Sequence, residues 1–366
     1  MDRKKFPGGL KPVFDHIKSL GMRPGLWISL ATADPSSIVL RDHPEWFVKG
    51  PDGQLTDLHN QRARSRTGCM GTDWYDYIKE KILYLEREYG LAYVKLDLSI
   101  LSSAYVFDRE RVGCHAHDHA LHRDWAESFD VIYSRCMQLF DELHRDAPDL
   151  FIDCTFETAG KMQLMDYGIA LHAEGNWLSN ITQPVPVGSL RMRDLAWGRS
   201  PVLPPASLVI GNLKMDEQRH ELNLKSLSGA LPIMLGDPRQ LTSEQRQRYR
   251  QWADWLKGLE RTHGYMSFRQ DLSGFGEPAE GSWDGFCRIN SETGSGGLVG
   301  VFNQGSMEKS RTIFVPYLLP DRMYQVRRGP SGEVVANASG KALAEEGFDV
   351  TLTAPYDGEL FEVVLQ

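Results

Sequence analysis

Helical periodicity alternates with short apolar runs between residues 9 and 260, and this alternation restricts the possible folds more than any other feature. Amphipathic spacing predicts helices at 9–21, 72–90, 124–149 and 242–260, and apolar runs predict strands near residues 25, 93, 151, 170, 207 and 232. Strands that alternate with helices form parallel βαβ units, and continuous apolar strands are typical of a sheet covered on both faces. The pattern predicts an α/β fold of the (β/α)8 TIM-barrel type, with an active site at the carboxyl ends of the strands.

The sequence after residue 260 has a different character. Short apolar strands such as "GLVGVFNQGS", "FDVTLTA" and "GELFEVVLQ" are separated by Gly, Pro and Asp turns, with a single short helical stretch at "SGKALAEEG". This spacing is typical of an antiparallel β-sandwich. We therefore expect a barrel domain over 1–260 and a small C-terminal β-sandwich domain over 261–366.

The predicted barrel is incomplete at its N-terminal side. A closed barrel of this kind has eight strands, whereas the sequence predicts six. Either two strands escape the pattern, or the chain starts inside the barrel and the first two are missing. An open arc of strands leaves two edges exposed. We expect either another chain over that gap, as in a homo-oligomer, or closure between the strands near 25 and 232.

Composition excludes several classes of protein. The net charge is −8, whereas nucleic-acid-binding surfaces are basic. No apolar run approaches the roughly 20 residues that cross a bilayer, so we expect no membrane partner. The five cysteines include no CxxC pair and do not indicate a disulfide framework, which favours a reducing, cytoplasmic location.

The stretch "YVKLDLS", residues 93–99, places Lys95 and Asp97 inside an apolar strand. Burying a charge is costly unless the charge is paired or used. Residues two apart in a strand point to the same face, and a cation favours the ionised form of a neighbouring carboxyl group. The pattern indicates either an ion pair inside the barrel or a catalytic nucleophile at the end of its strand.

A second carboxylate opposite Asp97 would complete the pair that glycoside hydrolysis needs. Glu174 follows the apolar run of "IALHAEGNW", which we interpret as a strand over 169–177, and is the candidate for general acid/base. The alternative is a loop carboxylate in solvent. Asp153 and Glu157, on the preceding strand and at its end, are competing candidates.

Tryptophans near the expected strand ends suit sugar binding, because aromatic faces stack on the C–H faces of sugars. Trp27 and Trp177 are candidates, although core burial is the commoner position of a tryptophan. The stretch "GCHAHDHALH", residues 113–122, contains metal-ligand residue types but no HExxH or CxxC spacing. We expect it to supply polar contacts to a ligand, and we expect no metal and no organic cofactor.

Four ordered segments resemble glycoside hydrolase family 36, the α-galactosidase family. "KFPGGLKPVFDHIKSLGMRPGLW", "DPSSIVLRDHPEW", "REYGLAYVKLDLS" and "DCTFETAGK" look like stretches that the family carries in this order. The resemblance extends over essentially the whole chain and implies a (β/α)8 barrel with a C-terminal β-domain. It also implies a large N-terminal β-domain and two barrel strands ahead of the first residue of this sequence.

The resemblance also implies roles for individual residues. Asp97 matches the nucleophile of the family's KxD motif, Lys95 the lysine that contacts the sugar and the nucleophile, and Trp27 a tryptophan near the sugar. Cys154 matches a cysteine near the sugar's C2 position, and Glu174 aligns with the acid/base, where the family has Asp.

This sequence departs from the family around the expected C2 position. Ser99 stands where the family has Asn, Thr155 to Glu157 replace a glycine-rich turn, and Lys161 stands at an arginine position. Of these, Ser99, Glu157 and Lys161 are expected to contact substrate, as is Cys154.

The resemblance implies a retaining exo-α-glycosidase, an α-galactosidase that acts on a small oligosaccharide or glycoside. The alternatives are a related α-glycosidase or transglycosylase for another sugar, such as an α-N-acetylgalactosaminide, and a catalytically inactive carbohydrate-binding relative or fragment. A further alternative is a metal-dependent hydrolase that uses the histidines of residues 113–122.

Overall fold

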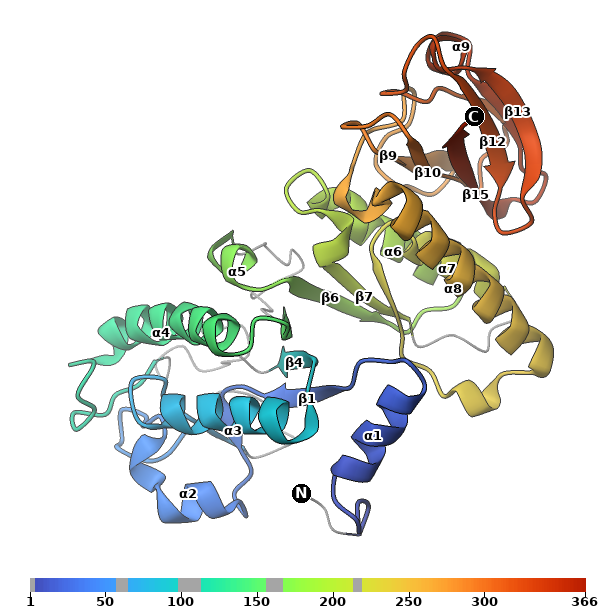
Figure 1. Cartoon of the computed structure of the whole chain (residues 1–366). Coiled ribbons are helices and arrows are strands. Elements are labelled where there is room, and N and C mark those ends of the chain that lie inside the picture. The colour runs from blue at the N-terminus through green and yellow to red at the C-terminus, as the bar shows by residue number, and fades with distance from the viewer. Residues whose placement is uncertain (1–3, 57–64, 98–112, 156–166, 213–218) are drawn as a thin grey trace. The chain divides into compact units, whose positions relative to one another are not determined.

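The computed structural model describes residues 4–56, 65–97, 113–155, 167–212 and 219–366 (Figure 1). The chain divides into two compact units, Met1–Trp177 and Leu178–Gln366. Strand β6 (Gly175–Ile181) contains the boundary between them. No described helix is both long and apolar enough to cross a lipid bilayer.

The first unit is built from parallel strands and the helices that follow them. Its elements are α1 (Lys11–Ser19), β1 (Gly25–Ser29), β2 (Thr32–Ala33), α2 (Ile38–Asp42), β3 (Arg66–Thr67), α3 (Trp74–Tyr89), β4 (Tyr93–Asp97), α4 (Trp125–Asp146), β5 (Phe151–Cys154) and α5 (Tyr167–His172). β1 pairs with β4 and β4 with β5, both in parallel. The predicted helices 9–21, 72–90 and 124–149 are confirmed within a few residues.

Local signals in the sequence explain where these helices begin and end. The Asp124 side chain caps α4 by accepting a hydrogen bond from the Glu127 backbone N–H. α3 stops at Gly90, whose left-handed backbone suits glycine. Apolar side chains on α3 and α4, such as Ile82 and Phe140, are buried in one core with Val94 and Ile152 of the strands.

The second unit continues the parallel strands and then changes to antiparallel sheets. It contains α6 (Val187–Arg199), β7 (Leu208–Asn212), α7 (His220–Leu227), β8 (Leu231–Met234) and α8 (Ser243–His263). The strands β9 (Ser282–Ile289), β10 (Gly296–Gln304), β12 (Met323–Arg328), β13 (Glu333–Ser339) and β15 (Tyr356–Leu365) form one antiparallel sheet, and β11 (Ser310–Ile313) pairs with β14 (Phe348–Thr351). A short helix, α9 (Gly340–Glu345), lies at "SGKALAEEG" as predicted. The capping box of Thr242 and Gln245 begins α8.

The two parts of the second unit are joined by a buried ion pair. Arg193 of α6 donates to both carboxylate oxygens of Asp284 on β9, at 2.7 and 2.9 Å, and both side chains are at most 3% exposed. Ser226 and Gln304 accept two further hydrogen bonds from the guanidinium. The expected division at residues 260 and 261 stays a prediction.

The parallel strands form one sheet in the order β1-β4-β5-β6-β7-β8, which confirms an α/β fold of barrel type with six strands. β1 and β8 are the outer strands of that order among the described residues, and the expected closure between the strands near 25 and 232 stays a prediction.

The predicted strand at 169–177 is also wrong. The segment forms α5 (Tyr167–His172), and β6 begins only at Gly175. A short apolar run fits a helix or a strand equally well by periodicity, and here the helix forms first along the chain. Glu174 therefore precedes a strand instead of following one.

Candidate functional site

The strand register brings the predicted charges together on one face of the sheet. Trp27 of β1 is level with Lys95 of β4, and Lys95 is level with Asp153 of β5. Asp97 is two residues beyond Lys95, at the carboxyl end of β4, and so shares its face. We call Trp27, Lys95, Asp97 and Trp177 the Asp97 site.

One oxygen of Asp97 holds the site together. Its Oδ2 accepts a hydrogen bond from Lys95 Nζ at 2.9 Å and another from Trp27 Nε1 at 2.9 Å. The Lys95 and Asp97 side chains are 13% and 24% exposed, so most of the surface of the pair is shielded from water. Two donors from different directions fix the plane of the carboxylate, which is the orientation that a nucleophile needs.

Trp27 offers its ring to solvent while its N–H is used by Asp97. The side chain is 55% exposed, which is high for a large aromatic residue on a strand of the parallel sheet. An exposed aromatic face beside a fixed carboxylate is a suitable surface for a sugar ring. The structure thus brings together three residues predicted for the site: Trp27, Lys95 and Asp97.

Trp177 was predicted to contact the sugar, but in the structure it contacts Lys95. It is 7% exposed, and Lys95 Nζ lies 4.2 Å from its ring centroid. A cation above an aromatic face is attracted to it. Trp177 therefore positions Lys95, and its buried ring is poorly placed for the direct sugar contact that the sequence suggested.

Asp153 and Tyr93 lie next to Lys95 on this face and were not predicted as a pair. Tyr93 donates its hydroxyl hydrogen to Asp153 Oδ2, and Asp153 is fully buried. Burial raises the pKa of Asp153 to about 6, the hydrogen bond from Tyr93 and the charge of Lys95 oppose this, and the charge of Asp97 adds to it. A Cβ at Gly175 would lie 3.1 Å from Asp153 Oδ1, so glycine there makes room for the carboxyl group.

Glu174 does not face Asp97, and this predicted pairing is wrong. Its carboxylate accepts a hydrogen bond from the Ile152 backbone N–H at 2.8 Å and lies 2.8 Å from His144 Nε2 of α4. Ile152 is level with Val94, three residues before Asp97 on β4, which is about 10 Å along the strand at roughly 3.3 Å per residue. That separation exceeds the roughly 5–5.5 Å expected between the two carboxyl groups of a retaining glycosidase.

Cys154 lies in the hydrophobic core with 0% exposure. It follows Asp153 directly in β5 and is level with Leu96, so its side chain points away from the face that carries Lys95 and Asp97. This position does not favour the predicted contact with a sugar. Ser99, Glu157 and Lys161, the other predicted contacts, lie outside the described residues.

Two features of the site follow from signals that sequence reasoning passed over. Tyr93 precedes Lys95 by two residues, so the same alternation that pairs Lys95 with Asp97 also places Tyr93 on their face. The bond between Trp27 and Asp97 depends on the register of β1 against β4, which joins residues 70 positions apart. Periodicity within one strand contains no information on that register.

Comparison with known proteins agrees with the fold. Residues 1–223 match the family model of the melibiases. An α-galactosidase of Escherichia coli is 34% identical over 99 residues, covering 27% of this chain and 13% of the relative. Alpha-galactosidase AgaA of Geobacillus stearothermophilus is 24% identical over 295 residues, covering 77% of this chain and 37% of the relative.

Solved structures show the same fold. The family 36 α-galactosidase AgaB of Geobacillus stearothermophilus superposes with a TM-score of 0.77 at 18% identity, and covers all of this chain with 47% of its own length. A doubly substituted variant of AgaA in complex with raffinose gives a TM-score of 0.75 at 18% identity, with 48% of that chain covered. This chain thus spans about half the length of the structures that it matches.

The family match covers more than half of the chain and includes all the residues of the Asp97 site. The parallel sheet and the antiparallel sheets that follow it agree with the structural neighbours. The chain belongs to the melibiase family of α-galactosidase-like proteins.

Proposed function

We propose that this chain is a retaining exo-α-glycosidase that releases terminal α-galactosyl residues by double displacement. The observation that carries the proposal is the position of Asp97, which is held by Lys95 and Trp27 at the carboxyl end of β4. Relatives with matching sequence are α-galactosidases, and AgaA has been solved with raffinose and with stachyose. We take a small α-galactosyl oligosaccharide or glycoside as the substrate.

In the first half of this reaction Asp97 attacks the anomeric carbon. A bond forms between its carboxylate oxygen and that carbon, and the bond from the carbon to the leaving oxygen breaks. Lys95 donates a hydrogen bond to Oδ2 of Asp97. Its positive charge therefore lies beside the carboxylate, which loses its negative charge when the glycosyl-enzyme forms and regains it when that bond breaks. The exposed ring of Trp27 supports the sugar next to the nucleophile.

The second group of the reaction is an acid/base that protonates the leaving oxygen and then activates water. Glu174 lies at the amino-terminal side of β5 and β6, which argues against this role for it. We propose that the acid/base is a different residue. A substrate whose leaving group departs without protonation needs no acid, so its rate of turnover measures the contribution of Asp97 separately from that of the acid/base.

The test compares the natural enzyme with Asp97→Ala on 2,4-dinitrophenyl α-galactoside, whose leaving group needs little protonation. We expect a loss of kcat on the order of 10³-fold or more, because no carboxylate remains to form the glycosyl-enzyme. Azide should restore turnover and give the β-galactosyl azide, because the small anion attacks from the vacated face. A variant that keeps the natural rate contradicts the proposal.

A second candidate function is sugar binding without turnover. The observation that favours it is the distance between Glu174 and Asp97, which leaves the described residues without the predicted acid/base pair. Calorimetry with raffinose, run beside the dinitrophenyl assay, separates the two. Binding with no turnover of the activated substrate supports the binding function, and turnover supports the glycosidase.

The identity of the sugar needs a separate comparison. A panel of nitrophenyl glycosides, including the α-galactoside and the α-N-acetylgalactosaminide, measures kcat/KM for each sugar. Product analysis with raffinose as acceptor detects transfer to a sugar instead of water. The proposal expects the α-galactoside to be the preferred member and water to be the main acceptor.

A further inference from the structure

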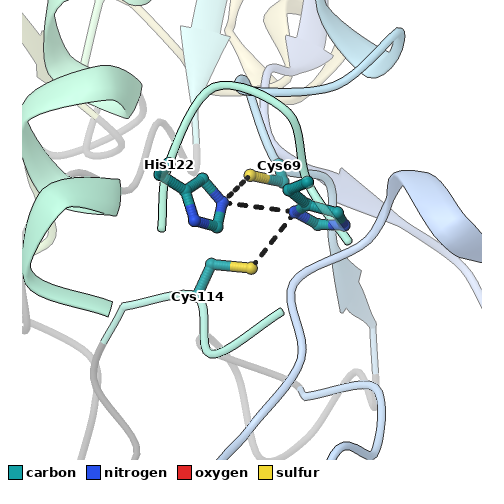
Figure 2. Close-up of side chains that lie close together, drawn as sticks. Cys69, Cys114 and His122 are labelled. Atoms are coloured by element: carbon teal, nitrogen blue, oxygen red, sulfur yellow. Dashed lines mark hydrogen bonds between the residues drawn. The ribbon is translucent and has the colours of Figure 1, made fainter. Parts of the chain in front are cut away.

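Four metal-ligand side chains meet in the first unit, and none of them belongs to the Asp97 site. Cys69 lies between β3 and α3, and Cys114, His119 and His122 lie in the segment before α4. One ligand atom from each lies within 4.8 Å of the other three. Figure 2 shows the side chains of Cys69, Cys114 and His122 turned toward a common centre.

The distances between these atoms match the edges of a tetrahedron around zinc. Zinc binds sulfur at about 2.3 Å and nitrogen at about 2.0–2.1 Å, which places two nitrogens about 3.3 Å apart and a nitrogen and a sulfur about 3.6 Å apart. His119 Nδ1 and His122 Nε2 are 3.2 Å apart. Cys69 Sγ lies 3.5 Å from His122 Nε2, and Cys114 Sγ lies 3.4 Å from His119 Nδ1.

The surroundings orient one histidine for metal binding. His119 Nε2 is 2.8 Å from the backbone carbonyl oxygen of Glu45, to which it donates its hydrogen. That bond fixes the tautomer in which Nδ1 carries a lone pair, and Nδ1 is the atom that faces the cluster. An outer hydrogen bond of this kind is the usual support of a metal-binding histidine.

Burial makes the cluster hard to explain without a cation. Cys69 and Cys114 are 0% exposed, and His122 and His119 are 3% and 6% exposed. Thiols are weak hydrogen-bond donors and acceptors, so they satisfy two buried imidazoles poorly. A divalent cation with two thiolates and two neutral imidazoles has no net charge and leaves no polar ligand atom unsatisfied.

Neighbouring residues hold the two segments at the required distance. Gly71 lies against the cluster, and a Cβ there would be 3.2 Å from His122 Cδ2 and 3.5 Å from Cys69 Sγ. The Ser128 hydroxyl accepts a hydrogen bond from the Cys114 backbone N–H at 2.9 Å. The Lys49 carbonyl accepts another from the His115 backbone N–H at 2.8 Å.

We propose that Cys69, Cys114, His119 and His122 bind one structural zinc ion. Four protein ligands complete the coordination and leave no open position for water or substrate, so the ion stabilises the fold and takes no part in catalysis. It ties the segment before α3 to the segment before α4. The site does not depend on the proposed glycosidase function, because none of its ligands belongs to the Asp97 site.

The test measures zinc by mass spectrometry in the purified full chain after gel filtration, beside three variants. We expect about one zinc per chain in the natural protein. Cys114→Ser and His119→Ala should contain about tenfold less, while His117→Ala should be unchanged. His117 is the matched control because it is an exposed histidine two residues from His119.

A second measurement covers the case in which the ligand variants fail to fold. Replacing zinc by cobalt(II) in the natural protein should give the visible absorption of a tetrahedral ion and a near-ultraviolet thiolate band. Natural protein that binds no zinc when the metal is supplied during refolding overturns the proposal. So does a count of three free thiols instead of five in metal-free denatured protein, which would indicate a disulfide between Cys69 and Cys114.

Discussion

At the scale of single residues, the central feature is the shared oxygen of Asp97. Lys95 and Trp27 both donate to Oδ2, and the Lys95 ammonium also lies 4.2 Å from the centroid of the Trp177 ring. Lys95 and Asp97 could be predicted to face one another because strand side chains alternate with a period of two. Trp27 could be predicted as a tryptophan near a strand end, and the family resemblance supported it, but its bond to Asp97 required the three-dimensional register.

Glu174 gives the first prediction at this scale. Glu174→Gln should leave kcat on an α-galactoside within about threefold of the natural enzyme, because Gln still accepts the Ile152 hydrogen bond and the carboxylate plays no part in the chemistry. Kinetic assay of the variant beside Asp97→Ala makes the comparison. A loss as large as that of Asp97→Ala would restore Glu174 to the active site.

Asp153 gives a prediction about pH. Its pKa is raised to about 6 in the folded chain, from a model-compound value of 3.8. Below pH 3.8 the Asp153 carboxyl group is mostly protonated in both the folded and the unfolded chain. As pH rises from about 4 to about 6 the unfolded chain loses the proton while the folded chain keeps it, so this group lowers stability with increasing pH.

The size of the effect follows from the shift, on the order of 2–3 kcal/mol above pH 6. Urea unfolding of Asp153→Asn beside the natural protein, at pH 4.5 and pH 7.5, isolates it. The variant should gain stability relative to the natural protein between the two pH values. An equal difference in the free energy of unfolding at both values contradicts a raised pKa.

At the scale of elements, the sequence predicted most helices and strands but misplaced one strand. The periodicity of α3, α4 and α8 extends over many residues and is distinctive, whereas 169–177 is a short run that suits either element. That single misassignment moved Glu174 from the amino end of a strand to the carboxyl end. The mistaken acid/base prediction followed directly from it.

The zinc ligands were missed for a related reason. Cys69 and Cys114 belong to segments on either side of α3 and β4, so no local spacing such as CxxC marks them. Sequence reasoning noted the histidines of residues 113–122 but had no basis for adding Cys69. The buried positions of Cys114, His119 and His122 do not fit the predicted polar contacts to a ligand.

The proposed zinc site, which joins the segments before α3 and before α4, leads to a prediction about thermal stability. A strong chelator should lower the Tm of the natural protein by about 5 °C or more, because zinc binds the folded chain far better than the unfolded one. His117→Ala should show the same fall, and His119→Ala should show almost none beyond its own lower starting value. Equal responses in His117→Ala and His119→Ala would argue against the proposed site.

The buried pair of Arg193 and Asp284 gives a prediction for α6 and β9. Arg193→Ala should cost about 3–5 kcal/mol, because Asp284 would be left as an unpaired charge at 1% exposure. Asp284→Asn leaves Arg193 as the unpaired buried charge, but it should cost less than Arg193→Ala, because the guanidinium keeps its hydrogen bonds to Ser226 and Gln304. Chemical unfolding of both variants provides the comparison.

At the scale of the whole molecule, the parallel sheet formed by the described residues has two outer strands, β1 and β8. An outer strand offers backbone N–H and C=O groups to another strand, and chains commonly cover such edges. We predict that the purified chain self-associates. Light scattering coupled to gel filtration should give a mass above the 41.4 kDa of one chain. A single species of 41.4 kDa contradicts the prediction.

The central claim, that Asp97 is the nucleophile of a retaining α-galactosidase, is tested most directly by trapping the glycosyl-enzyme. Incubation with 5-fluoro-α-galactosyl fluoride, digestion and peptide mass spectrometry identify the labelled residue. We expect one sugar per chain, on the peptide that contains Asp97, and no label in Asp97→Ala. A label on another residue, or steady turnover of α-galactosides with no label at Asp97, would contradict the account.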